Sequence, residues 1–219
     1  MMDESKPKRE PVTLGTTIGA IMCADGIVLA ADSRTSAGPL IATEGTDKIV
    51  ELSNNCILLK CGNAAVSNMM RDMCMTQMKL FERVNGEPMP IKGIAHILSK
   101  ILYKYQRILE SAFIICGYDR HSGYQIYSLK AGSFFPANVI SKGSGSIFII
   151  ESMQEFFTGK NTTEETLPFM KKCILQAVNC DSSSGGVVNL KILRKDGITR
   201  CEIIDPSIRL DTSASSRVY

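Results

Sequence analysis

The sequence is poor in several residues on which common kinds of site depend. Among its 219 residues there is no tryptophan, there are two histidines, and none of the eight cysteines lies in a C-x-x-C pair. Neither His96 nor His121 has a paired cysteine or carboxylate nearby at the spacing that zinc sites use. A Ser-His-Asp enzyme would have to use one of these two histidines, in unsuitable surroundings. The sequence therefore disfavours both a zinc protein and a hydrolase of the Ser-His-Asp kind.

Long apolar runs, a secretory signal and a strong net charge are missing as well. No run approaches about 18 apolar residues, the length that a membrane-spanning helix needs. Residues 1–11 are polar and lack the apolar centre of a secretory signal. The formal net charge is +3 and the pI is about 8.4, whereas a nucleic-acid-binding protein usually carries a concentrated basic stripe. We therefore expect no nucleic acid and no membrane among the partners.

The remaining composition is that of an ordinary globular protein. Hydrophobic residues make up 44% of the chain and charged residues 21%, and the length suits one domain or at most two small ones. Most of the cysteines lie within apolar runs, and the chain is too long and too rich in core residues for a disulfide scaffold. The cysteines are best interpreted as reduced, buried thiols of a cytosolic or nuclear protein.

Hydrophobic periodicity predicts strands and helices in separate runs. Residues 1–14 form a charged leader without periodicity, interpreted as a flexible tail or a removable extension. Period-two patterns and turn residues predict strands over 16–23, 27–32, 47–52, 56–61, 112–118, 124–131, 134–141, 187–194 and 199–204, with a polar loop over 33–46. Helical spacing predicts helices over 63–84, 91–109 and 163–179, the last with a capping box at Thr162 and Glu165 and with Pro168 inside it. Such segregated runs indicate an α+β fold.

Two glycine-rich stretches first suggest phosphate binding. Residues 143–146 and 182–186 lack the G-x-x-x-x-G-K-[ST] spacing of a nucleotide loop. Taken alone, each is better explained as a tight turn.

A more specific pattern is made by short motifs at the ends of the predicted strands. Each is unremarkable alone, since Asp32 suits a turn and Lys48 suits a solvated surface. The motifs are Gly15-Thr16-Thr17, Asp32-Ser33-Arg34, Thr46-Asp47-Lys48, Cys61-Gly62-Asn63, Gly143-Ser144-Gly145 and Asp181-x-x-Ser184-Gly185. Together, in this order and on this plan of strands and helices, they closely resemble the catalytic β subunits of the 20S proteasome, which are N-terminal-nucleophile hydrolases. The resemblance runs from Thr16 to about Ile204.

This resemblance implies a fold, a domain division and an assembly. The fold would be a four-layer αββα sandwich, with residues 1–15 as a removable leader and residues 16–219 as the N-terminal-nucleophile hydrolase domain. The partners would be other proteasome α and β subunits in stacked heptameric rings, with unfolded polypeptide as the substrate. The location would be the cytoplasm and the nucleus, and neither a metal ion nor an organic cofactor is implied.

The resemblance also implies a role for each site residue. Cleavage after Gly15 would free Thr16, the nucleophile, whose own α-amine would then act as its base, because an amine of pKa about 7.7–8.0 is poised near neutral pH. The other implied roles are Lys48 beside Thr16, Asp32 holding Lys48, the backbone N–H of Gly62 as the oxyanion donor, and Ser144, Asp181 and Ser184 orienting the amine and its water.

Lys60 carries the expectation about substrate choice. A lone lysine among apolar strand neighbours is either an outward-facing residue or the floor of a pocket. Counted from Thr16, it matches the base of the substrate pocket, which is basic in the caspase-like subunit, and Thr35, Ser36 and Thr46 resemble the polar wall of that pocket. A buried ammonium would select Asp or Glu. The family usually has arginine at this position, and lysine loses its bidentate recognition of a carboxylate.

Other functions are compatible with the same motifs. A sister specificity, trypsin-like or chymotrypsin-like, is one alternative, and a non-catalytic structural β subunit is another. A third is an amidase of the wider N-terminal-nucleophile group that acts on a small molecule.

Overall fold

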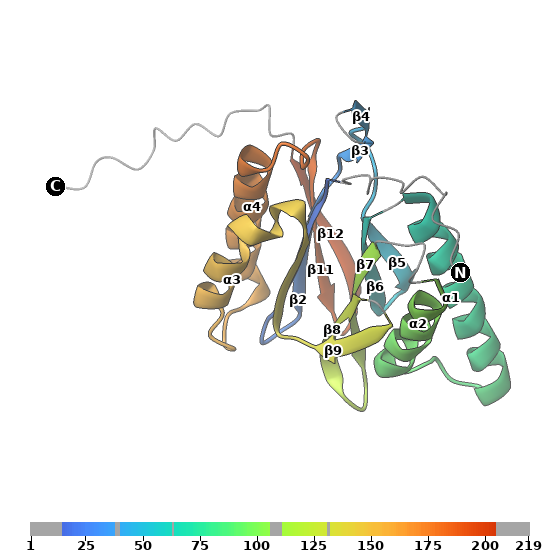
Figure 1. Cartoon of the computed structure of the whole chain (residues 1–219). Coiled ribbons are helices and arrows are strands. Elements are labelled where there is room, and N and C mark those ends of the chain that lie inside the picture. The colour runs from blue at the N-terminus through green and yellow to red at the C-terminus, as the bar shows by residue number, and fades with distance from the viewer. Residues whose placement is uncertain (1–14, 38–39, 63, 106–110, 131, 205–219) are drawn as a thin grey trace, which may run out of the picture.

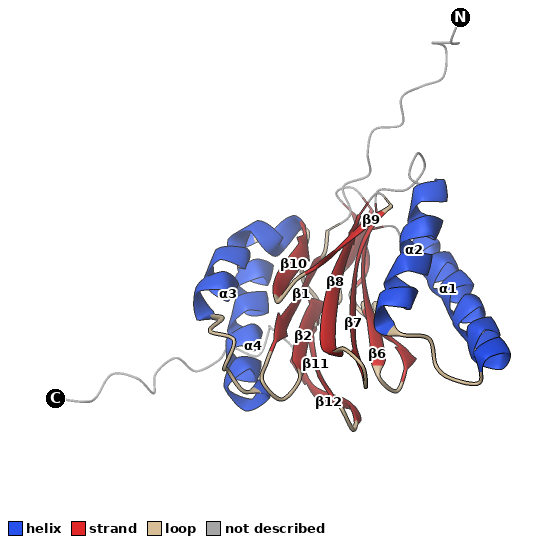
Figure 2. Ribbon diagram, turned by 90° about the horizontal axis from the view of Figure 1, so that it is seen from below, coloured by secondary structure: helices blue, strands red, loops and turns tan. Residues whose placement is uncertain are grey.

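Two five-stranded sheets pack face to face, and helices cover both outer faces (Figure 1). The computed structural model describes residues 15–37, 40–62, 64–105, 111–130 and 132–204. The leader over residues 1–14, the predicted helix end over 106–109 and the C-terminal residues 205–219 lie outside this part. The four layers are those of the α+β sandwich expected from the sequence, and Figure 2 shows the two sheets between their helices.

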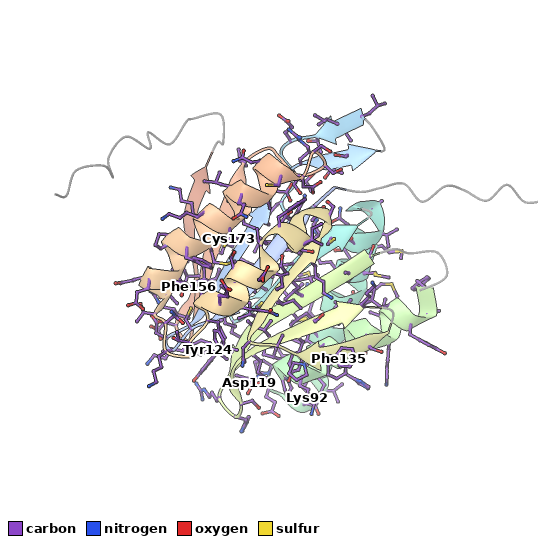
Figure 3. All side chains as sticks on the ribbon, turned by 60° about the vertical axis from the view of Figure 1, so that its left-hand side comes forward. Lys92, Asp119, Tyr124, Phe135, Phe156 and Cys173 are labelled. Atoms are coloured by element: carbon purple, nitrogen blue, oxygen red, sulfur yellow. The ribbon has the colours of Figure 1, made fainter. Side chains whose placement is uncertain are left out.

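The first sheet has the strand order β10-β1-β2-β11-β12. Its strands are β1 (Thr17–Met22), β2 (Ile27–Asp32), β10 (Val139–Gly143), β11 (Val188–Arg194) and β12 (Gly197–Ile204). The short helix η1 (Ser144–Phe148) and the helices α3 (Ile150–Phe156) and α4 (Thr163–Cys180) cover its outer face. In Figure 3, Phe156 and Cys173 lie in this helical layer.

The second sheet has the order β5-β6-β7-β8-β9. Its strands are β5 (Ile49–Ser53), β6 (Cys56–Gly62), β7 (Ser111–Asp119), β8 (Gly123–Lys130) and β9 (Ser133–Pro136). The helices α1 (Ala64–Asn85) and α2 (Ile91–Tyr105) cover its outer face. A separate hairpin, β3 (Thr35–Ala37) and β4 (Leu40–Thr43), projects from the end of the sandwich, and its second strand is exposed (Figure 1).

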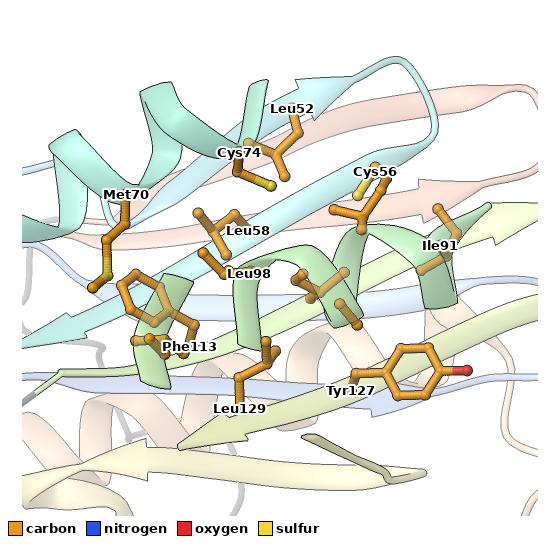
Figure 4. Packing of buried hydrophobic residues seen from close by; sticks show 14 of the residues in the cluster. Leu52, Cys56, Leu58, Met70, Cys74, Ile91, Leu98, Phe113, Tyr127 and Leu129 are labelled. Carbon is orange, nitrogen blue, oxygen red and sulfur yellow. The ribbon is translucent and has the colours of Figure 1, made fainter. Parts of the chain in front are cut away.

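The side chains of β6 point alternately into the two apolar cores on either side of the second sheet. Ile57 and Leu59 belong to the apolar core between the two sheets, whereas Leu58 belongs to the core under α1 and α2 (Figure 4). Because successive side chains of a strand point to opposite faces, Lys60 shares the face of Leu58 and points toward the helices. The lone lysine of this strand is therefore directed into the protein, and it is 8% exposed.

The structure corrects the sequence reading in three places. The single strand predicted over 134–141 is wrong, because β9 ends at Pro136, which has no N–H to donate, and the chain then crosses to the other sheet as β10. The polar loop predicted over 33–46 contains the hairpin β3–β4. The helices η1 and α3 are not predicted at all, and their lengths of 5 and 7 residues leave little periodicity to detect.

The capping box of the last helix is confirmed. The N–H of Glu165 donates to the Thr162 hydroxyl, and the N–H of Thr162 donates to the Glu165 carboxylate at 2.9 Å. The helix begins at Thr163, as predicted, and Pro168 lies inside it.

Candidate active site

Thr16 lies one residue before β1, at the end of an interior strand of the first sheet. Its side chain is buried, and the register of the hairpin pairs Ile18 of β1 with Ala31 of β2. This register brings Asp32, the last residue of β2, beside the start of β1, where the N–H of Thr17 donates a hydrogen bond of 2.8 Å to Asp32 Oδ1. The hairpin itself therefore places Asp32 next to the Thr16–Thr17 segment.

Asp32 forms a buried ion pair with Lys48. Lys48 Nζ lies 2.7 Å from Asp32 Oδ1, and the two side chains are 3% and 0% exposed. The other carboxylate oxygen accepts the N–H of Gly185 at 3.0 Å. Burial lowers the pKa of the Lys48 ammonium, and the charge of Asp32 opposes that change. Because buried charges persist only when paired and hydrogen-bonded, Asp32 both balances the lysine and fixes its position.

A second polar network centres on Asp181, just after α4. Its Oδ2 accepts hydrogen bonds from Ser144 Oγ at 2.6 Å and from Ser184 Oγ at 2.7 Å. Burial raises the pKa of this carboxyl, but the hydrogen bonds and the charge of Lys48 outweigh burial and lower the pKa below its ordinary value. The backbone nitrogen of Thr16 donates to Ser144 Oγ at 3.3 Å. The ionised Asp181 therefore orients a hydroxyl that contacts the nitrogen of Thr16.

One narrow pocket collects half of the site residues that were predicted from the sequence. Its lining comes from the residue before β1, from β3, from the segment before β5, from β6 and from α1: Thr16, Thr35, Thr46, Lys48, Lys60, Gly62 and Ser67. All of these except Ser67 are site residues predicted from the sequence. The φ angle of Gly62 is +111°, a conformation that favours glycine. Thr35 and Thr46 are joined by a hydrogen bond of 2.8 Å between their hydroxyls.

Lys60 reaches from β6 toward the first turns of α1. Its Nζ donates a hydrogen bond of 2.8 Å to Asn68 Oδ1. Burial is the largest influence on the Lys60 ammonium and lowers its pKa, and the charge of Arg71 acts in the same direction, while Asp47 and Asp72 oppose it. The pocket is thus bounded on one side by a cation that is held in place by an amide.

Two predicted residues, Ser36 and Gly15, belong neither to the pocket lining nor to the polar networks around Asp32 and Asp181. Ser36 is not among the residues that line the pocket; its hydroxyl donates to the carbonyl of Ser183 at 3.3 Å. Gly15 precedes the pocket, and its carbonyl accepts a hydrogen bond of 2.5 Å from the Thr16 hydroxyl.

Two residues of the pocket region, Ser67 and Asn68, were not predicted from the sequence. Ser67 is 1% exposed, and its hydroxyl has no hydrogen-bond partner among the described residues. Asn68 holds Lys60. The available signal is that Ser67 lies three residues before Met70 and seven before Cys74, on the buried stripe of α1. A serine on an apolar helical stripe indicates a polar environment below it.

Other hollows of the described chain contain none of the predicted site residues. Larger hollows lie between α2 and β9, around Tyr103 and Phe134, and between α1 and α2, around Met73 and Ile101, and neither is lined by a predicted site residue. In the part that the structure describes, no group of three or more His, Cys, Asp or Glu side chains could hold a metal ion. None of the described helices is both long and apolar enough to cross a membrane.

Comparison with known proteins points to one family. A family model described as "Proteasome subunit" matches residues 12–193. The chain is 33% identical to the probable proteasome subunit beta type-1 of Schizosaccharomyces pombe, over 91% of this chain and 88% of the relative. It is 30% identical to the proteasome subunit beta type-6 of Arabidopsis thaliana, over 87% and 82%, and 33% identical to the proteasome subunit beta type-9 of Rattus norvegicus, over 85% of each.

Proposed function

This chain belongs to the proteasome subunit family as a β-type member, and we propose that it is a catalytic one. It is a threonine endopeptidase of the 20S core that is activated by cleavage of the Gly15–Thr16 bond and cuts proteins preferentially after acidic residues. The observation that carries the proposal is that Thr16, Lys48, Gly62 and Lys60 line one pocket.

The nucleophile is the hydroxyl of Thr16. This hydroxyl attacks the carbonyl carbon of the scissile peptide bond, its proton passes to the freed α-amine of Thr16 directly or through a water, and the leaving amine of the substrate then takes that proton. The resulting ester is hydrolysed by water. Lys48, held by Asp32, supports the negative charge that develops on the hydroxyl oxygen. It also keeps the amine unprotonated, because a nearby cation disfavours a second positive charge.

The amine is held by the network around Asp181. In the uncut chain the nitrogen of Thr16 already contacts Ser144, which is itself hydrogen-bonded to Asp181. The same atom becomes the α-amine after cleavage, so Ser144, Asp181 and Ser184 orient the base and its water. The backbone N–H of Gly62 donates to the oxyanion, an interaction typically worth about 2.7–4 kcal/mol.

Residues 1–15 form a removable leader that keeps the enzyme inactive. While Gly15 is attached, the nitrogen of Thr16 is an amide and cannot act as a base. The Thr16 hydroxyl lies beside the carbonyl of the bond to be cut. Any side chain at Gly15 would collide with the neighbouring loop, since a Cβ there would lie 1.9 Å from the Ser183 carbonyl oxygen. Residues 16–219 then form the mature hydrolase domain.

The preference for acidic residues comes from the side of the pocket that Lys60 forms. Its ammonium attracts a substrate carboxylate and repels arginine or lysine. The hydroxyl of Ser67, which has no hydrogen-bond partner in the part of the chain that the structure describes, supplies a second donor, and the linked hydroxyls of Thr35 and Thr46 form a polar wall. Ser36 follows Thr35 in β3, and its hydroxyl donates to the Ser183 carbonyl.

As a proteasome subunit, the chain assembles with other subunits of the particle. In our proposal these are the α and β subunits of stacked heptameric rings, the substrate is unfolded polypeptide, and the location is the cytoplasm and the nucleus.

The acidic preference is tested by replacing Lys60 with methionine, which keeps much of the side-chain length but removes the charge. Core particles that carry Lys60→Met are expected to lose about tenfold to a hundredfold in kcat/KM for a fluorogenic peptide with Asp at the cleavage position, the range expected for one buried charged contact. Cleavage after Leu is expected to rise. Lys92→Met, on the exposed face of α2, is the control. An unchanged ratio of Asp to Leu cleavage contradicts the role of Lys60.

The pKa of Lys60 predicts how this preference depends on pH. Because burial lowers that pKa, the ammonium is lost at a lower pH than in an ordinary lysine, and the attraction for Asp is lost with it. We expect the ratio of Asp to Leu cleavage to fall as the pH rises from about 7 to about 10, near the ordinary lysine pKa. Lys60→Arg stays charged over this range and should hold the ratio constant. Parallel declines in the wild type and in Lys60→Arg would show that another group titrates.

A further inference from the structure

A buried lysine connects the two sheets close to the candidate active site. Lys191 lies in β11 opposite Leu29 of β2, and it is 9% exposed. Leu29 and Leu193 both belong to the core between the sheets, whereas Leu190 and Ile192 belong to the core under α4. By the alternation of strand side chains, Lys191 points from the first sheet toward the second.

Its ammonium group ends at the beginning of β5. Lys191 Nζ donates a hydrogen bond of 3.1 Å to the carbonyl of Ile49 and one of 2.8 Å to Glu51 Oε1. A lysine ammonium carries three donors and requires acceptors when it is buried. Glu51 is 52% exposed, so water can replace the lysine there. The Ile49 carbonyl, by contrast, belongs to β5, the edge strand of the second sheet, and points away from the neighbouring strand β6.

The hydrogen bond from Lys191 to the Ile49 carbonyl fixes the backbone directly after Lys48. On the inner side of β5, the Lys48 carbonyl accepts the N–H of Lys60 at 3.0 Å. On the outer side, the next carbonyl, that of Ile49, is held by Lys191. The backbone of Lys48 and Ile49 is therefore tied on one side to β6, which carries Lys60 and Gly62, and on the other side to β11.

The strand that carries Lys191 is also paired with the strand that carries Asp32. Val188 of β11 lies opposite Asp32 of β2, three residues from the pairing of Lys191 with Leu29. The two partners of the ion pair between Lys48 and Asp32 belong to different parts of the sandwich. Lys191 links them, since it holds the backbone at Lys48 to the strand beside Asp32.

We infer that Lys191 is a positioning residue for catalysis, which acts through the Ile49 carbonyl to hold Lys48 against Asp32 and beside Thr16. This inference rests on the proposed function. It assigns Lys191 a role in catalysis in addition to its place in the core. The two roles are distinguishable, since a purely structural lysine would affect folding and assembly but leave the turnover of assembled particles unchanged.

The test uses core particles in which this chain carries Lys191→Met or Lys191→Leu. Both replacements are apolar and enter an apolar layer, and the carboxylate of Glu51 that they leave without its cation is 52% exposed and can be hydrated by water. Two variants guard against failure of one to assemble. We expect kcat for the Asp peptide to fall about tenfold, because small displacements of catalytic groups cost up to a hundredfold. KM should stay unchanged, because the pocket at Lys60 is intact.

Two further variants separate the two contacts. Lys191→Arg retains charged donors for the Ile49 carbonyl and should restore most of kcat. Glu51→Gln removes the charge of the exposed partner but leaves the bond to Ile49, so its kcat should equal that of the wild type. A loss in Glu51→Gln as large as that in Lys191→Met would assign the effect to the ion pair and overturn the route through Ile49.

The remaining outcomes are decisive. Assembled particles with Lys191→Met or Lys191→Leu that turn over at the wild-type kcat overturn the inference, as does a rise in KM at constant kcat. A wild-type particle in which this chain has lost its leader but cleaves no peptide refutes the proposed function instead, so the two failures are distinguishable.

Discussion

Core particles in which this chain carries Thr16→Ala are expected to lose every cleavage that the chain performs and to keep residues 1–15. Alanine lacks the hydroxyl that, in the proposed mechanism, attacks both the substrate and the Gly15 carbonyl beside it. Loss of a catalytic nucleophile lowers kcat by about 10⁶-fold, which for a peptide substrate means background. Hydrolysis of a peptide with Asp at the cleavage position and the intact mass of the subunit measure the two effects.

Thr16→Ser is the matched control for this substitution. Serine keeps the hydroxyl and loses only a methyl group, so measurable cleavage and leader removal should persist. The alanine variant should still assemble, because the Thr16 side chain contributes one small group to a large core. Cleavage after Asp at the wild-type rate by purified Thr16→Ala particles would refute Thr16 as the nucleophile.

Replacement of Lys48 by methionine is expected to have the next largest effect. The ion pair is buried on both sides, so the substitution removes the cation beside Thr16 and leaves Asp32 without its partner. Without this cation the amine of Thr16 keeps its proton more tightly. We expect kcat to fall about 10³-fold, within the range for an acid–base group, and leader removal to slow in parallel.

This substitution should also destabilise the subunit, since breaking a buried ion pair typically costs about 3–5 kcal/mol. Activity is therefore compared per assembled particle, with particle yield and thermal unfolding measured alongside. Lys92→Met, an exposed lysine of α2 that is labelled in Figure 3, should change neither quantity. Normal leader removal and normal kcat in Lys48→Met particles would show that the lysine is not needed.

The parts of the fold that could be predicted from the sequence are those set by local pattern. Asp25 and Gly26 between two apolar runs predict the hairpin β1–β2, and that hairpin brings Asp32 to the N–H of Thr17, next to Thr16. The capping box at Thr162 and Glu165 marks the start of α4. The pocket residues were predicted in a different way, from the resemblance of several motifs to a known family, because each motif is unremarkable alone.

The features that could not be predicted from the sequence depend on contacts between distant parts of the sandwich. Pro136 marks the end of β9 locally, but nothing local shows that the chain continues in the other sheet as β10. Ser36 is a small polar residue of the kind that lines a pocket wall. Only the tertiary structure shows that its hydroxyl instead donates to the Ser183 carbonyl. Ser67 and Lys191 are ordinary polar residues in the sequence, and they gain meaning from burial and from partners far along the chain.

The most direct test of the account is the intact mass of this subunit taken from native core particles whose cleavage of an Asp peptide has been measured. The account predicts a chain that begins at Thr16 and particles that cleave after Asp. A subunit that retains residues 1–15 in an otherwise complete and active particle would contradict it, because an amide nitrogen at Thr16 cannot serve as the base. The chain would then be a structural β subunit.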